Sequence, residues 1–96
     1  MYILRIEHSV LNFEGWKLAF DNDPASREKA GVRRYQILRS VEDPFYVMID
    51  LEFDNEIGAR ALLAAMRVVW GRVTGKIITN PKALIVEVVE TKKFVI

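Results

Sequence analysis

His8 is the side chain of this sequence best suited to acid–base chemistry, because the unperturbed pKa of histidine, ~6.5, lies close to neutrality. Tyr35 could supply a proton or a hydrogen bond to a carbonyl group, and Arg39 could clamp an anionic or enolic oxygen. Each residue also has an ordinary explanation: a hydrogen-bonded strand cap for His8, packing for Tyr35 and a solvated rim for Arg39. We therefore treat His8 and Tyr35 as candidate catalytic residues and Arg39 as a candidate ligand-binding residue.

Several other chemistries lack the residues that they need. The chain has no cysteine, which excludes disulfides, thiolate metal sites and thiol nucleophiles. A single histidine excludes multi-histidine metal sites. The glycines form neither a GxGxxG nor a P-loop pattern, and no serine has the spaced partners of a Ser-His-acid triad. We expect neither a metal site nor a bound cofactor.

The composition predicts one domain, residues 1–96, with enough apolar side chains for a core: 51% of the residues are hydrophobic and 28% are charged. Fourteen Lys and Arg oppose thirteen Asp and Glu, whereas nucleic-acid and polybasic membrane binders need a concentrated positive excess. Neither kind of partner is expected. The N-terminal run lacks a signal-peptide cleavage site, and the apolar runs 61–66 and 83–89 are shorter than the ~20 residues that span a bilayer. We expect a cytoplasmic protein.

Periodicity and capping signals predict six elements. Residues 2–8 alternate as a strand, and Asn12 is expected to cap a helix that carries Phe13, Trp16, Ala19 and Phe20 on one face and ends before Pro24. A short helical segment is expected at 26–30, and strands at 33–41, 45–53 and 83–90. A second helix, capped by residue 54 or 55, should run to about Trp70 with Gly71 as its stop, and residues 91–96 form a tail.

The order strand, helix, strand, strand, helix, strand is typical of the ferredoxin-like α+β fold, a four-stranded antiparallel sheet with two helices on one face. Its strand order, 4-1-3-2, places the first and third strands side by side. Arg5 and Glu7 then lie near Asp50 and Glu52, where they can form cross-strand pairs. A carboxylate metal site is the alternative, but it lacks further ligands.

Two helices cover only one face of such a sheet. The residues that we assign to the opposite face include six apolar side chains, Ile3, Leu38, Tyr46, Met48, Ile85 and Val89, which are too many to leave in water. A second copy packed sheet to sheet about a two-fold axis would cover them and form a dimeric α/β barrel. The apolar end of the tail, residues 94–96, would either dock on the partner or fray.

Short motifs stand in order between Tyr2 and Arg60. They are His8-x-Val10, Phe13-x-x-Trp16-Lys17-x-x-Phe20-Asp21, Arg27-x-x-x-Gly31-Val32-x-x-Tyr35-x-Ile37-x-Arg39, Asp43-Pro44 and Glu52-Phe53-Asp54. Their order and spacing resemble the dimeric α/β-barrel superfamily, small proteins related to antibiotic-biosynthesis monooxygenases and polyketide cyclases. That superfamily includes cofactor-independent oxygenases, haem-degrading enzymes, decarboxylases and stress-response proteins, so the resemblance implies a fold and no single reaction.

The resemblance also implies a small-molecule cleft between the sheet and the helices. By alternation, the residues facing it are His8, Tyr35 and Arg39 from strands, Trp16 and Phe20 from the first helix, and Leu63, Met66 and Trp70 from the second. Trp16, Phe20, Met66 and Trp70 are thus candidate ligand-binding residues, although aromatic and Met residues at helical spacing are more often plain core. Arg27, in a polar connection, could reach over the cleft mouth or only solvate its loop.

The haem-degrading branch is not expected. It uses an asparagine on the first strand and an iron-binding histidine after a tryptophan late in the second helix. Trp70 fits the tryptophan, but no histidine follows it, and Glu7 and His8 stand about where the asparagine would be.

Two functions follow. The first is a homodimeric protein that binds a small hydrophobic, oxygenated molecule, either as a binding protein or as a cofactor-independent monooxygenase- or cyclase-like enzyme with His8 as acid or base. The second is a non-catalytic dimer, a ligand sensor or a scaffold. The sequence leaves open whether the chain is an enzyme.

Overall fold

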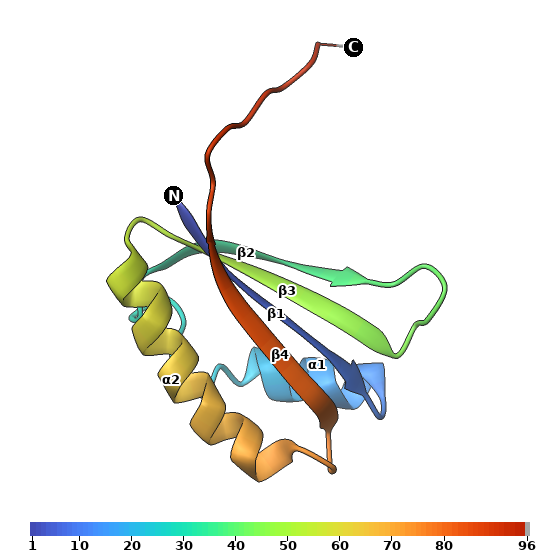
Figure 1. Cartoon of the computed structure of the whole chain (residues 1–96). Coiled ribbons are helices and arrows are strands. Elements are labelled where there is room, and N and C mark those ends of the chain that lie inside the picture. Colours follow the sequence, from blue (N-terminus) through green and yellow to red (C-terminus); the bar gives the residue numbers. More distant parts are fainter. Residues whose placement is uncertain (96) are drawn as a thin grey trace.

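The computed structural model describes residues 1–95. The chain folds in the order β1 (Tyr2–Val10), α1 (Phe13–Asp21), β2 (Val32–Arg39), β3 (Tyr46–Phe53), α2 (Glu56–Val73) and β4 (Ile78–Glu87). The strands form one antiparallel sheet of order β2-β3-β1-β4, so β2 and β4 are its edges. Both helices lie on the same side of the sheet (Figure 1). The predicted ferredoxin-like fold and its strand order are confirmed.

Strict alternation decides which sheet face is buried. In β1 and β3 every second residue points to the helices and is buried, and these residues are Leu4, Ile6, His8 and Val10 with Val47, Ile49, Leu51 and Phe53. Leu62, Leu63, Ala59 and Trp70 of α2 and Trp16 of α1 complete the core. Phe45, which we expected at the start of this strand, lies just outside it and is exposed.

Both helices begin at an asparagine cap. The Asn12 side-chain oxygen accepts a hydrogen bond from the Gly15 N–H at 2.7 Å, and the Asn55 oxygen accepts one from the Gly58 N–H at 2.8 Å. Each bond satisfies an N–H that the first helical turn leaves without a backbone partner. The predicted caps are confirmed.

Helix α2 runs three residues past its predicted end. Gly71 is helical because it lies on the exposed side, where it disturbs no packing. The helix stops at Thr74, whose N–H and hydroxyl both donate to the Trp70 carbonyl, at 2.9 and 2.6 Å. Residues 26–30, expected as a short helix, form turns that follow left-handed conformations at Asp23 and Ser26.

Strand β4 begins five residues before its predicted start and ends at Glu87, three residues early. Pro81 does not break it because β4 is an edge strand and carries a bulge there: the register with β1 shifts between Glu7 and Ser9, and Asn80 takes a φ of 53°. Beyond Glu87 the Val88 N–H still donates to the Met1 carbonyl at 3.0 Å.

The helix-free face of the sheet, which we call the open face, carries both charges and apolar side chains. Its apolar residues are Ile3, Leu38, Tyr46, Met48, Leu84 and Val86. Two predicted members were wrong: Ile85 pairs with Leu4 and packs against the core, and Val89 lies beyond the strand. The bulge and the longer β4 changed which residues of that strand face the helices.

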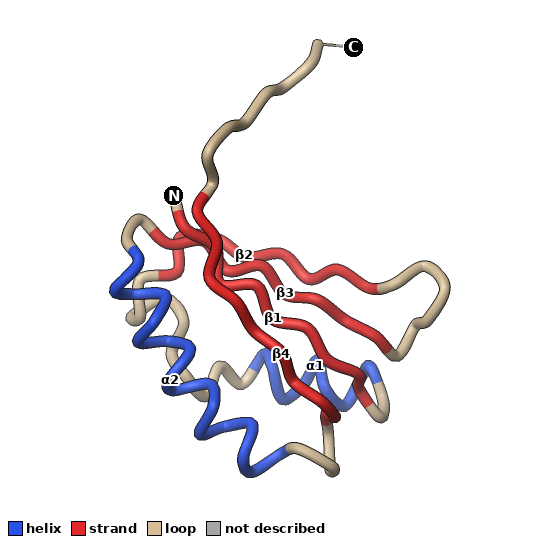
Figure 2. The backbone as a smooth tube through the Cα atoms, in the orientation of Figure 1, coloured by secondary structure: helices blue, strands red, loops and turns tan. Residues whose placement is uncertain are grey.

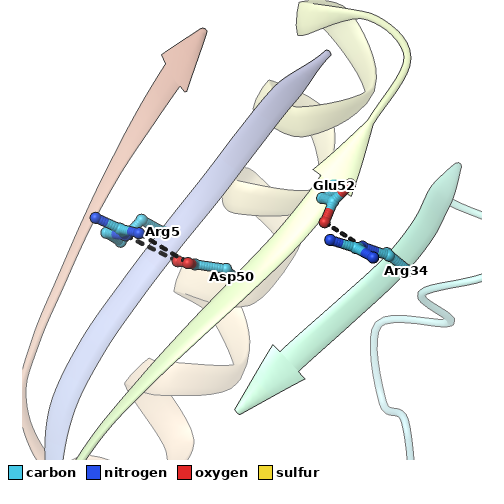
Figure 3. A network of polar contacts seen from close by, with 4 residues as sticks. All are labelled: Arg5, Arg34, Asp50 and Glu52. Atoms are coloured by element: carbon cyan, nitrogen blue, oxygen red, sulfur yellow. Dashed lines mark hydrogen bonds and ion pairs between the residues drawn. The ribbon is translucent and has the colours of Figure 1, made fainter. Parts of the chain in front are cut away.

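The charges of the open face pair across strands, as predicted. Arg5 donates through Nε and Nη2 to both oxygens of Asp50, each at 2.8 Å, and Arg34 pairs with Glu52 (Figure 3). Asp50 is only 5% exposed. Glu7 instead accepts a hydrogen bond from the Tyr46 hydroxyl. Within residues 1–95, no group of three or more His, Cys, Asp or Glu side chains is placed to hold a metal ion.

Residues 88–95 form an extended arm that leaves the domain (Figures 1 and 2). Phe94 is 77% exposed and Val95 is exposed completely. The last residue of the predicted tail, 96, lies outside the described residues. None of the helices in the described chain combines the length and the apolar character needed to cross a membrane.

Candidate functional site

A cavity of about 290 Å³ lies between the helix side of the sheet and the two helices. Its walls are largely aliphatic and aromatic, with His8, Asn22, Arg27 and Arg72 as the residues that carry polar side chains. The other lining residues are Ile6, Trp16, Ala19, Phe20, Pro24, Ile49, Leu51, Leu62, Met66, Val69, Trp70, Val73, Ile77 and Ile78. An apolar hollow with a few polar groups is the usual form of a small-molecule site.

Five of the seven candidate residues line this cavity: His8, Trp16, Phe20, Met66 and Trp70. Trp16 and Phe20 lie one turn apart on α1, and Met66 and Trp70 lie one turn apart on α2, so each helix presents a pair of bulky side chains. The expected placement of these five residues is therefore observed. Their roles stay predictions.

Tyr35 and Arg39 do face the helix side of β2, since they pair with Leu51 and Val47, but neither lines the cavity. The Tyr35 ring meets the Phe20 ring edge-on at 5.2 Å. The Arg39 guanidinium lies 4.7 Å from the centre of the Phe13 ring. Leu63 is buried in the core and also does not line the cavity.

His8 is the buried polar group of the cavity. It is 2% exposed, its ring meets Trp16 edge-on at 5.7 Å, and its Nδ1 lies 3.3 Å from the Ser9 carbonyl oxygen. Burial lowers the pKa of His8, and hydrogen bonds to the Ser9 and His8 carbonyls only partly oppose this shift. The imidazole is therefore neutral at neutral pH. Because a carbonyl only accepts, the proton sits on Nδ1 and the Nε2 lone pair can accept from a ligand.

The aromatic side chains of α1 form a continuous row. Ring centres are 5.7 Å apart for Phe13 and Trp16, 5.3 Å for Trp16 and Phe20, and 5.2 Å for Phe20 and Tyr35. Such rings lose little conformational freedom when a flat ligand stacks on them. Trp16 and Phe20, the members of this row that line the cavity, thus supply a rigid wall for an aromatic ligand.

Arg27 closes one end of this row. Its guanidinium stacks 3.8 Å from the centre of the Phe20 ring and 5.1 Å from that of Tyr35, and its Nη1 donates to the Phe20 carbonyl at 2.9 Å. Asp23 holds the loop by accepting from the Arg27 backbone N–H at 2.8 Å. The same arginine borders a shallow polar groove that Tyr35 also lines.

The sequence reasoning missed Arg72 and Val73. We predicted Gly71 as the helix stop, yet the spacing Leu62, Met66, Val69, Val73 continues one helical face past it and could have revealed the longer lining. For Arg27 the sequence left two positions open, over the cleft mouth or in solvent, because a loop has no periodicity that would indicate where its side chains point.

No family model matches the chain, and no curated protein matches it. Solved structures do. A candidate antibiotic biosynthesis monooxygenase from Deinococcus radiodurans is 18% identical with a TM-score of 0.74, the match covering 99% of each chain. SnoaB, a cofactor-independent oxygenase from Streptomyces nogalater, is 13% identical with a TM-score of 0.75, over 94% of each chain. A dimeric ferredoxin-like protein from an uncultured marine organism is 12% identical with a TM-score of 0.66, covering 95% of this chain and 97% of that one.

Identities this low establish a shared fold and not a shared reaction. The chain therefore has the ferredoxin-like fold of the antibiotic-biosynthesis-monooxygenase-like structures, and the resemblance seen in its sequence is confirmed for the fold.

Proposed function

We propose that this chain is a homodimeric small-molecule-binding protein whose cavity takes a hydrophobic, oxygenated ligand. The observation that carries the proposal is an apolar cavity, floored by two central strands, with one buried neutral histidine in its wall. A neutral imidazole in an otherwise apolar wall offers a ligand hydroxyl one polar partner.

Within this proposal the aromatic row and Trp70 would stack the ring system of the ligand, and Met66 would fill the space beside it. A catalytic form of the function would use His8 as the general base, with Nε2 taking a proton from an acidic O–H or C–H of the ligand. SnoaB is described as a cofactor-independent oxygenase, which is chemistry of the kind that such a base could begin. Tyr35 and Arg39 remain candidates for orienting oxygens of the ligand.

The open face supports the dimer. Six apolar side chains share it with an ion pair whose carboxylate, that of Asp50, is already almost inaccessible. Two of the similar structures are described as dimeric ferredoxin-like proteins. Packing two such faces together would bury the apolar side chains of both copies in one symmetric contact.

A thermal-shift assay with 1-naphthol and 9-fluorenone tests ligand binding. A ligand of the folded state at 100 times its Kd stabilises the protein by about 2.7 kcal/mol and raises the Tm by about 10 °C or more. Ala19→Phe, which fills the cavity, should abolish the shift, whereas Ala64→Phe on the exposed side of α2 should keep it. An unchanged Tm with both compounds would contradict the proposal and favour a scaffold whose own side chains fill the site.

A further inference from the structure

The charged residues that line the cavity are both arginines, and the nearest carboxylate, that of Asp23, lies 3.4 Å from Arg27 outside the lining. Arg27 and Arg72 line the cavity, and within residues 1–95 no Asp or Glu does. The chain as a whole is nearly balanced, with fourteen basic and thirteen acidic residues, so this is a local imbalance. Two guanidinium groups beside an apolar wall favour negative charge there.

Arg27 has donors to spare. Its side chain is 13% exposed and held in place by the Phe20 carbonyl and ring, but these contacts and a 3.4 Å approach to Asp23 involve only Nη1 and the flat face of the group. A guanidinium carries five N–H donors in a planar fork that matches the two oxygens of a carboxylate. The stacking therefore positions the group while most of its N–H donors stay available.

Arg72 supplies the second charge from the last turn of α2. Within the described chain it forms no ion pair, in contrast to Arg60, which pairs with Glu56 on the same helix. Because no carboxylate of the described chain pairs with it, the Arg72 guanidinium is available to an anionic ligand.

Resting on the proposed function, we propose that the cavity selects ligands that join a flat apolar ring system to one carboxylate, and that Arg27 binds this carboxylate while the charge of Arg72 attracts it. An anion would not enter the apolar part of the cavity, because leaving water without a partner is too costly. Arg27, stacked on Phe20, thus fixes the orientation: the acid group lies at Arg27, Arg72 adds positive charge to the cavity wall, and the rings extend along Phe20 and Trp16 toward His8.

Isothermal titration with 2-naphthoate and with naphthalene-2-carboxamide tests this, since the two probes share size and shape and differ in charge. The acid should bind about tenfold more tightly, the difference expected for charge-assisted hydrogen bonds. Arg72→Gln should weaken the acid about tenfold and leave the amide unchanged, and Arg27→Gln should weaken the acid about tenfold more than the amide, since Arg27 also packs on the Phe20 ring. Arg67→Gln, which removes the same charge from α2 away from the cavity, is the matched control and should leave both affinities unchanged.

Three other results would contradict the proposal in part or in whole. Equal affinities for acid and amide would overturn the charge selection while leaving small-molecule binding intact, and binding of neither would overturn both. An equal loss in Arg67→Gln and Arg72→Gln would show a diffuse effect of net charge and overturn the assignment of these arginines. Should Arg27→Gln fail to fold, Arg72→Gln alone decides, because that side chain is exposed and has no structural partner in the described chain.

Discussion

Protonation of His8 should make folding stability depend on pH near neutrality. Burial lowers the pKa of His8 in the folded protein, whereas in the unfolded chain it titrates near ~6.5. Below that pH the unfolded chain holds a proton that the folded protein lacks. The free energy of unfolding should therefore be constant above about pH 7.5, as far as this group is concerned, and fall as the pH drops from about 6.5 toward the folded-state pKa.

The size of the effect has a firm upper limit. One group contributes at most about 1.4 kcal/mol per pH unit, and only while it is protonated in the unfolded chain alone. If the folded protein keeps His8 neutral throughout, the loss between pH 7.5 and pH 5.5 is about 1.4 kcal/mol. The other shifted groups, Tyr2, Arg5 and Tyr46, have pKa values raised from 10 or higher and do not titrate in this window.

Urea unfolding followed by tryptophan fluorescence, at one protein concentration across pH 5.5–7.5, measures this loss. Because the chain has a single histidine, His8→Gln removes all histidine titration and should flatten the profile, whatever its own stability. The His8 Cε1 proton in an NMR titration of the folded protein should give a pKa below 6.5. A flat profile in the unmodified chain, or the same slope in His8→Gln, would refute the buried neutral imidazole.

Two further predictions concern the helix cap and the open face. Asn55→Ala should lower the free energy of unfolding by about 1 kcal/mol, because the Gly58 N–H loses its acceptor. Asn55→Asp keeps an acceptor and should cost far less. Equal midpoints of urea unfolding for the unmodified chain and both variants would contradict this prediction. If the chain forms the proposed dimer, Met48→Glu should be monomeric in sedimentation velocity, because its charge would enter the apolar contact, while Val68→Glu on exposed α2 should stay dimeric. A dimeric Met48→Glu, or an unmodified chain that is monomeric at micromolar concentration, would refute the sheet-to-sheet contact.

The fold could be predicted from the sequence because alternation and capping are local signals. The apolar face of β3 and the caps Asn12 and Asn55 needed no knowledge of distant residues. The errors arose at helix and strand breakers, since Gly71 and Pro81 are tolerated for reasons that only the tertiary structure contains: an exposed helix side for one, an edge strand with a bulge for the other.

The residues of the candidate site were also only partly predictable from the sequence. Alternation correctly placed Tyr35 and Arg39 on the helix side, but it indicates a face and not a distance. Because β2 is the outermost strand, both side chains pack on aromatic rings of α1 instead of reaching the cavity. For Arg27 the sequence left two positions open because it lies in a loop, and Arg72 was missed because it lies past the predicted end of the helix.

The strand order has a consequence for behaviour at high concentration. A sheet with two free borders exposes backbone N–H and C=O groups that could recruit identical chains into filaments. Here three of the eight residues of β2 are arginines, 33, 34 and 39, and long charged side chains on an edge strand hinder the addition of a further strand. On the opposite border Pro81 withholds an N–H and the bulge bends the strand. Edge-to-edge association of the sheet is thus disfavoured. Copies of the chain can associate through the open face instead.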